Sequence, residues 1–151
     1  MNVSLKRAPA LLGAASVALG LAACGSTVST AGFQGEEHKV AQALSSFQSD
    51  ATAGDAHKIC TSDLAKTVVA RLNATELKSG STTASTVAGC ERAIKNQLIQ
   101  VDNLEAKIEA VKVAPGGGSA SATVKSIRYG KSTLESVSLL REGASWKISG
   151  P

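Results

Sequence analysis

The chain has 151 residues, of which 43% are hydrophobic and only 3% aromatic, and its formal net charge is +4. Once a leader is set aside, this length suits one domain, whose core has to be built mainly from Ala, Val, Leu and Ile. From Lys39 to Lys147 the basic residues are scattered singly, unlike the clusters that follow a phosphate backbone, so nucleic acid is not expected as a partner.

The N-terminal residues have the layout of a secretory signal peptide. Lys6 and Arg7 form a positive start, and a largely apolar run follows over residues 8–23. As a helix this run spans about 24 Å, which is shorter than the ~30 Å hydrocarbon core of a bilayer. The sequence therefore favours a cleaved leader over a permanent transmembrane anchor.

The end of the leader, Leu21-Ala22-Ala23-Cys24, resembles the lipobox of bacterial lipoproteins. The resemblance implies that residues 1–23 are the lipoprotein signal peptide and that Cys24 carries a diacylglycerol on its sulfur. We therefore expect an extracytoplasmic protein that is lipid-anchored to the cell membrane. An ordinary signal peptide with an incidental cysteine is the alternative. Residues 24–35 are small and polar and predict a lipidated tether, and residues 36–151 form the domain.

The other two cysteines, Cys60 and Cys90, form an even pair in an exported, oxidising setting, which predicts a disulfide. The metal alternative places His57 and Cys60 on the same side of a helix as two zinc ligands. Neither a C-x-x-C nor an H-x-x-x-H spacing is present. The sequence therefore favours the disulfide, and it predicts no metal site and no cofactor.

The first half of the domain has helical periodicity. Residues 36–54 predict an amphipathic helix, because apolar side chains recur at helical spacing after two glutamates that suit the N-terminal dipole. Asp55 is placed to cap a short second helix, and Thr61 or Ser62 to cap the run that follows. After a loop rich in Ser and Thr, Cys90 enters a third helix.

After residue 101 the apolar period changes from 3.6 to two. Strands are predicted over 104–113 and 119–129, separated by a proline and three glycines. Short turns then lead to a strand with Val137 and Leu139 and to a last strand with Trp146 and Ile148. Short connections indicate an antiparallel meander, so the fold class is α+β, with N-terminal helices packed on a four-stranded sheet.

This order of elements, with Cys60, Cys90, the strand segment 119–124 and the closing segment 139–148, resembles a bacterial lipoprotein group of the nuclear-transport-factor-two-like superfamily. The resemblance covers about residues 36–150. It implies a strongly curved sheet that forms a cone against the helices, and this cone often holds a ligand or an active site. Likeness of fold does not by itself carry function.

The residues expected to line the cone follow from strand parity. None of them can transfer a proton, so no catalytic residue is assigned among them. His57 beside Asp55 is interpreted as a solvated pair, Asp102 as a solvated residue at the junction of helix and sheet, and Tyr129 as facing away from the interior. The expected lining residues are Ala120, Ala122, Val124, Val137, Leu139, Trp146 and Ile148.

The predicted function is therefore non-catalytic. We expect a membrane-anchored lipoprotein whose cone binds a small apolar ligand or an envelope partner. One alternative is an isomerase-like or cyclase-like enzyme that uses the cone as its active site, which requires at least two titratable groups to converge there with perturbed pKa values. The other is a purely structural accessory module, whose cone would be filled by its own side chains.

Overall fold

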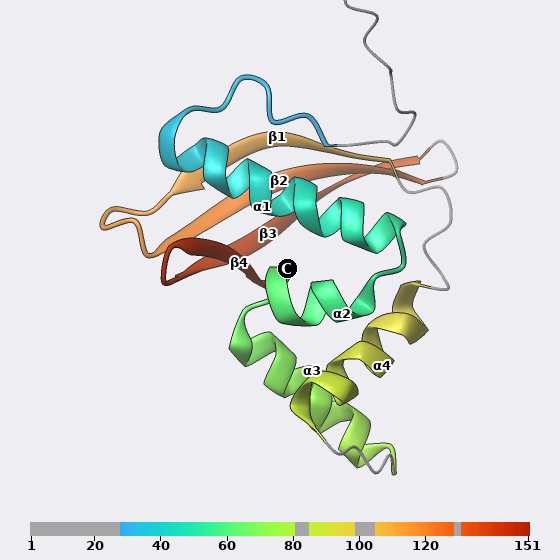
Figure 1. The fold of residues 1–151 in the computed structure, drawn as a ribbon. Helices are drawn as coiled ribbons and strands as arrows, with labels where there is room; N and C mark the ends of the chain where they lie inside the picture. The colour runs from blue at the N-terminus through green and yellow to red at the C-terminus, as the bar shows by residue number, and fades with distance from the viewer. Residues whose placement is uncertain (1–27, 81–84, 99–104, 129–130) are drawn as a thin grey trace, which may run out of the picture.

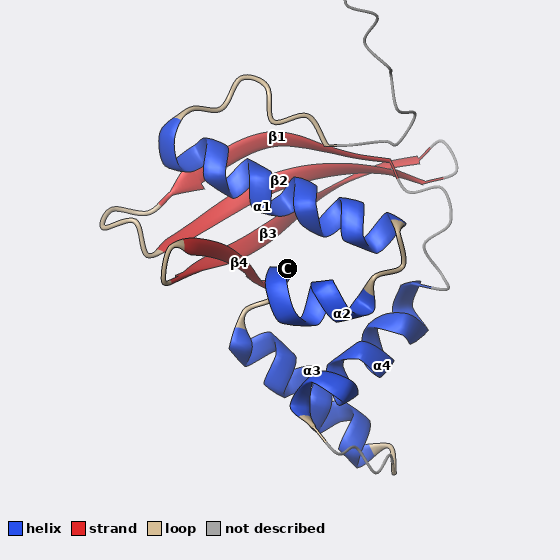
Figure 2. Cartoon of the chain, in the orientation of Figure 1, coloured by secondary structure: helices blue, strands red, loops and turns tan. Residues whose placement is uncertain are grey.

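The structure is a computed structural model that describes residues 28–80, 85–98, 105–128 and 131–151. Helices come first along the chain and a four-stranded sheet follows (Figures 1 and 2). The predicted α+β class is thus confirmed. The predicted signal peptide and residues 24–27 of the predicted tether lie outside the described residues. Within the described ranges, no helix is long and apolar enough to cross a membrane.

The sheet consists of β1 (Glu105–Val113), β2 (Ser119–Arg128), β3 (Lys131–Glu142) and β4 (Ser145–Gly150). The strands lie side by side in chain order, and each pair is antiparallel. The turn between β1 and β2 uses Gly116 and Gly117 at φ values of 91° and 67°, which only glycine adopts without strain. The predicted meander is confirmed.

A β-bulge corrects the simple alternation that the sequence predicts for the first strand. Ile108 pairs with Val124, but Thr123 pairs with Ala110, so the register shifts at Glu109. Without the extra residue, Ile108 and Val111 would point to opposite faces of the sheet. The bulge lets both side chains enter the core, where their exposed fractions are 5% and 7%.

Helix α1 (Gly35–Thr52) lies across one face of the sheet and contacts β1, β2 and β4. Val40, Ala41 and Leu44 are buried at helical spacing, which confirms the predicted amphipathic helix. Residues that precede α1 in the sequence also belong to the core, because Val28 is only 5% exposed and Phe33 packs against the buried cluster. The chain therefore joins the core before α1 begins.

The second helical layer contains α2 (Ala56–Lys58), the π-helical turn η1 (Ile59–Asp63), α3 (Lys66–Lys78) and α4 (Thr86–Leu98). Asp55 caps α2 as predicted, because its Oδ1 accepts a hydrogen bond from the Lys58 backbone N–H at 3.0 Å. Helices α3 and α4 pack closely at Gly89, where a Cβ atom would lie 2.0 Å from Asn73 Oδ1 and 3.0 Å from the backbone Cα of Asn73. The crossing therefore requires glycine at this position.

The predicted caps of the next helix, Thr61 and Ser62, are wrong. The chain stays helical through Asp63, and Leu64 is extended and forms a parallel bridge with Ile148 of β4. The start of α3 is instead capped from the far end of the chain. Glu142 Oε1 accepts a hydrogen bond from the Lys66 backbone N–H at 3.0 Å, where a carboxylate also favours the helix dipole.

Candidate functional site

The predicted lining residues share one face of the sheet, and all seven belong to the hydrophobic core or pack against it. Ala122 and Leu139 are each 1% exposed, Trp146 is 4% exposed, and Val124 and Val137 are partly buried. Helix α1 packs across this face of the sheet, and η1 contacts it at β4. Of the seven, only Trp146 lines either of the two grooves described below.

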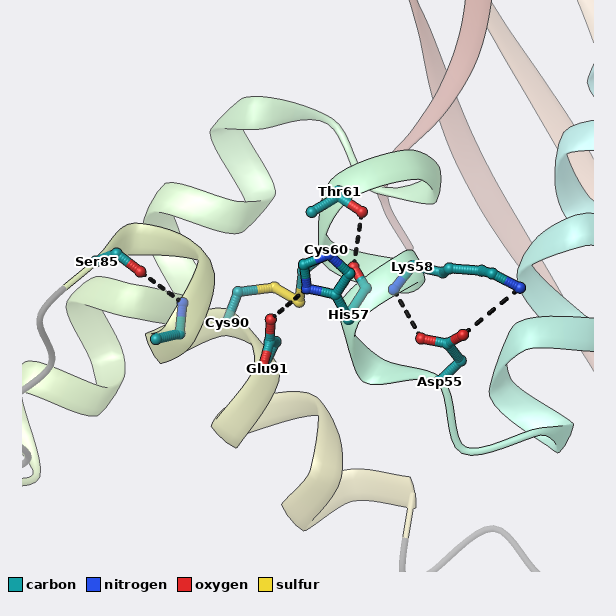
Figure 3. Close-up of a disulfide and its surroundings, with 9 residues drawn as sticks. Asp55, His57, Lys58, Cys60, Thr61, Ser85, Cys90 and Glu91 are labelled. Atoms are coloured by element: carbon teal, nitrogen blue, oxygen red, sulfur yellow. Dashed lines mark hydrogen bonds and ion pairs between the residues drawn. A yellow bond between two sulfur atoms is a disulfide. The ribbon is translucent and has the colours of Figure 1, made fainter.

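The predicted disulfide is present and joins η1 to α4 (Figure 3). Cys60 and Cys90 are buried, and their Cα atoms are 6.1 Å apart. The zinc alternative is wrong, because the Cys60 sulfur is bonded to the Cys90 sulfur and is not a free ligand. Beside the bridge, His57 Nδ1 lies 2.7 Å from Glu91 Oε1 on the exposed surface. Asp102 and Tyr129 lie outside the described residues.

Trp146 is tied to the first turn of α1 by a polar contact at the edge of the core. Its Nε1–H donates to Glu36 Oε2 at 3.1 Å, and Arg141 Nη1 lies 3.5 Å from the same oxygen. Lys39 Nζ is 2.6 Å from the other oxygen, Glu36 Oε1. The hydrogen bonds from Lys39 and then from Trp146 lower the pKa of Glu36. The carboxylate thus joins α1 to both strands of the last hairpin.

A groove opens next to this contact, between α1, η1 and the edge of β4. Its volume is about 480 Å³, and hydroxyl, amide and charged side chains make up most of its lining. One wall comes from α1 and the other from the turn and first residues of β4, with η1 at the end. The lining residues are Lys39, Gln42, Ala43, Ser46, Ser62, Asp63, Ala144, Ser145, Trp146 and Lys147.

The groove runs along an edge of the sheet. β4 is the last strand in the sheet order, and it pairs with β3 on one side only. On its other side, Ile148 bridges to Leu64 and its carbonyl accepts from the Ala65 N–H at 2.8 Å. Among the described residues, no strand pairs with the outer edge of β4 at Ser145 to Lys147. This segment lines the groove.

Asp63 is the buried charged residue of the groove. It is 7% exposed, and its Oδ2 has no hydrogen-bond partner. Burial, the neighbouring negative charge of Asp50 and a hydrogen bond with that carboxyl together raise the pKa of Asp63 to about 7, although Lys147 and Lys58 act in the opposite direction. Two carboxyls that share a site cannot easily both ionise. Asp63 therefore holds a proton close to neutral pH.

The free energy of unfolding is expected to fall as the pH rises through about 7. The pKa of Asp63 is raised from 3.8 to about 7 in the folded chain, so the folded state binds the proton more tightly than the unfolded state. This contribution is fully present below about pH 4 and is lost above about pH 7. Asp63→Asn stays uncharged and should remove about 1–3 kcal/mol of this pH dependence in urea titrations between about pH 4 and pH 8.

Asp55→Asn is the matched control for this pH series. The backbone hydrogen bond from Lys58 lowers the pKa of Asp55, so its replacement should leave the fall in stability near neutral pH unchanged. If the wild type and Asp63→Asn lose stability in parallel between about pH 4 and pH 8, the carboxyl of Asp63 does not hold the proton.

A second groove of about 510 Å³ lies on the other side of η1, over the disulfide. Leu64, Val69 and Val87 make it more apolar than the first groove, and Glu142 and Lys147 form its polar rim. The Lys147 ammonium donates to the Ser62 carbonyl. Lys147 lines both grooves.

Asp50, Asp63 and Glu36 are site residues that were not predicted from the sequence. For Asp63 a signal is present, because Ala56, Ile59 and Cys60 form the buried face of a helical turn and Asp63 continues that face. A carboxyl at an apolar position is informative. Asp50 and Glu36 have no comparable signal, because Asp63 and Trp146, which give the two carboxyls their place in this site, belong to other segments of the chain. Comparison of the chain with known protein families, with curated proteins and with solved structures finds no match to any of them.

Proposed function

We propose that this protein is a lipid-anchored extracytoplasmic lipoprotein of the nuclear-transport-factor-two-like type, and that it binds an extended polypeptide segment of an envelope partner without catalysis. The anchor rests on the lipobox-like residues that end in Cys24. The cone-like fold rests on the resemblance carried by the order of elements, Cys60, Cys90, the strand segment 119–124 and the closing segment 139–148. The binding function rests on the groove beside β4.

The observation that carries the binding function is the position of the groove at the outer edge of β4. An unpaired strand edge presents backbone N–H and C=O groups to an incoming chain, which is how many domains bind extended peptides. Ser46, Ser62 and Ser145 add hydroxyl groups to the walls. By contrast, a small apolar ligand calls for a concave, mostly apolar pocket, and the apolar face of this sheet is packed with the protein's own side chains.

In cells, a photo-crosslinker such as p-benzoylphenylalanine is expected to trap a discrete partner from Gln42 but not from Thr75. Gln42 lines the groove, whereas Thr75 is an exposed residue of α3. Ser46→Trp fills the groove and should abolish the adduct, and Ser49→Trp, at an exposed position of α1 that does not line it, should not. Cys24→Ala should lose both palmitate incorporation and the adduct.

Equal adducts from Gln42 in the Ser46→Trp and Ser49→Trp proteins would show that the groove is not the binding site. Equal palmitate incorporation into the wild type and Cys24→Ala would remove the lipid anchor. The two tests are distinguishable, since Ser46→Trp alters the groove with Cys24 intact, and palmitate labelling reports the modification of Cys24 without the adduct.

A second candidate function is favoured by the carboxyl pair. Asp63 lines the groove, and burial and then the negative charge of Asp50 raise the pKa of Asp63 to about 7, which is the range in which a general acid or base works best. An isomerase-like or cyclase-like reaction would use such a pair. A turnover that disappears in Asp63→Asn while the Gln42 adduct persists would favour this function over binding alone.

A further inference from the structure

The face of the sheet that points away from α1 is exposed and carries both apolar and basic side chains. Leu134 is 67% exposed, and Leu140 and Ile127 are 39% and 36% exposed. The same face carries small hydroxyl residues, because Ser121 pairs with Ser138 and Thr123 pairs with Ser136.

Three lysines lie on this outer face over β1 and β2. Lys107 pairs directly with Lys125, and Lys112 pairs with Ser121. Like charges at directly opposed positions repel each other. Glu109 Oε1, 3.2 Å from Lys107 Nζ, offsets one of them. Leu134 is the cross-strand neighbour of Lys125, so an exposed apolar side chain stands among the ammonium groups. An anionic surface placed against this face would neutralise the lysines and cover Leu134.

The N-terminal end of the described chain limits how far the domain can lie from a lipid on Cys24. Val28 is buried in the core, so only residues 24–27 separate the predicted lipid from the packed domain. Fully extended, four residues reach at most about 14 Å. In Figure 1 the segment that starts at Val28 lies at the β1 side of the molecule, far from α3 and α4. The anchor therefore holds the β1 side near the bilayer.

We propose that the outer face of β1, β2 and β3 lies on the anionic phospholipid bilayer to which Cys24 is anchored. This inference rests on the lipid anchor of the proposed function. At the ionic strength of a cell, charges interact over about 8 Å. A tether of at most about 14 Å allows the domain to rest with Lys107, Lys112 and Lys125 within that distance of the headgroups. The exposed Leu134 adds apolar contact at the headgroup boundary. The opposite face, with the groove, then points toward solvent and a partner.

The test uses the full lipidated chain in vesicles of phosphatidylcholine alone and of phosphatidylcholine with about 30% phosphatidylglycerol. Ser136→Cys places a thiol on the outer face, and Ser79→Cys places one at the end of α3. A neutral maleimide reports the accessibility of each. In the anionic vesicles, modification of Ser136→Cys is expected to slow at least about fivefold, the effect of one lysine near such a surface, and modification of Ser79→Cys is expected to stay constant.

Charge variants identify the groups responsible. Lys107→Gln/Lys112→Gln/Lys125→Gln should restore fast modification of Ser136→Cys, as should about 1 M salt, which shortens the screening length to about 3 Å. The matched control Lys78→Gln/Arg92→Gln/Lys95→Gln removes the same charge from exposed positions of α3 and α4 and should leave the slow rate unchanged.

Two results would overturn the proposal, and they are distinguishable. If the protein sediments with both kinds of vesicle but Ser136→Cys is modified equally fast in both, the anchor is present and the outer face of the sheet does not lie on the bilayer. Protein that sediments with neither kind lacks the anchor, and the proposed lipoprotein function then fails together with this inference.

Discussion

Replacing Trp146 with alanine is expected to lower the free energy of unfolding by about 3–5 kcal/mol. The indole is 4% exposed and lies in the core between α1 and the sheet. Its removal leaves a cavity in the core. The variant also loses the Nε1–H bond to Glu36. Urea denaturation followed by circular dichroism measures the change without relying on tryptophan fluorescence.

Two variants separate packing from polarity at this site. Trp146→Phe keeps most of the ring volume but loses the donor to Glu36 Oε2, so it should cost only about 1–2 kcal/mol. Leu140→Ala, on the exposed outer face, should change stability by less than about 1 kcal/mol. A Trp146→Ala protein as stable as Leu140→Ala would mean that the indole is not packed in the core.

The elements that could be predicted from the sequence are those whose pattern is local. Val40 and Leu44 recur at helical spacing and do face the sheet, and the glycines at 116–118 do form the turn between β1 and β2. The sequence predicts simple alternation in β1 and does not predict its bulge. The order of apolar and polar residues is the same whether Glu109 pairs with β2 or is the additional residue of a bulge. Only the need to bury both Ile108 and Val111 selects the bulge.

Long-range pairings explain what the sequence did not show. The N-terminus of α3 was expected to be capped by Thr61 or Ser62, since hydroxyl residues are common caps. In the structure Leu64 instead pairs with Ile148, and Glu142 supplies the acceptor across 76 residues. The groove has the same origin, because Gln42, Ser62 and Ser145 come from three separate segments. No local pattern places such residues together.

The disulfide could be predicted from the number of cysteines and the predicted oxidising compartment. Its removal is expected to have the second large effect on the free energy of unfolding. Cys60→Ala/Cys90→Ala is expected to lower the free energy of unfolding by about 3.5–4 kcal/mol, the loop-closure entropy for a sequence separation of 30. The bridge holds α4 to η1, whereas the other main contacts of α4 are with α3 and α2. Helix α4 should therefore show the largest gain in amide hydrogen exchange.

Reductant provides the internal control for this prediction, because it breaks the bridge without removing a side chain. The wild type should lose stability when dithiothreitol is added and approach the double variant, whose own midpoint should not move. Cys60→Ala alone should fall below the double variant, since it leaves the Cys90 thiol, which is 0% exposed in the folded chain, without its bonded partner. Thiol alkylation of the denatured, unreduced mature wild type should label neither Cys60 nor Cys90. Labelling of both, with a midpoint insensitive to dithiothreitol, would mean that the bridge does not form in the exported protein and that packing alone holds α4 in place.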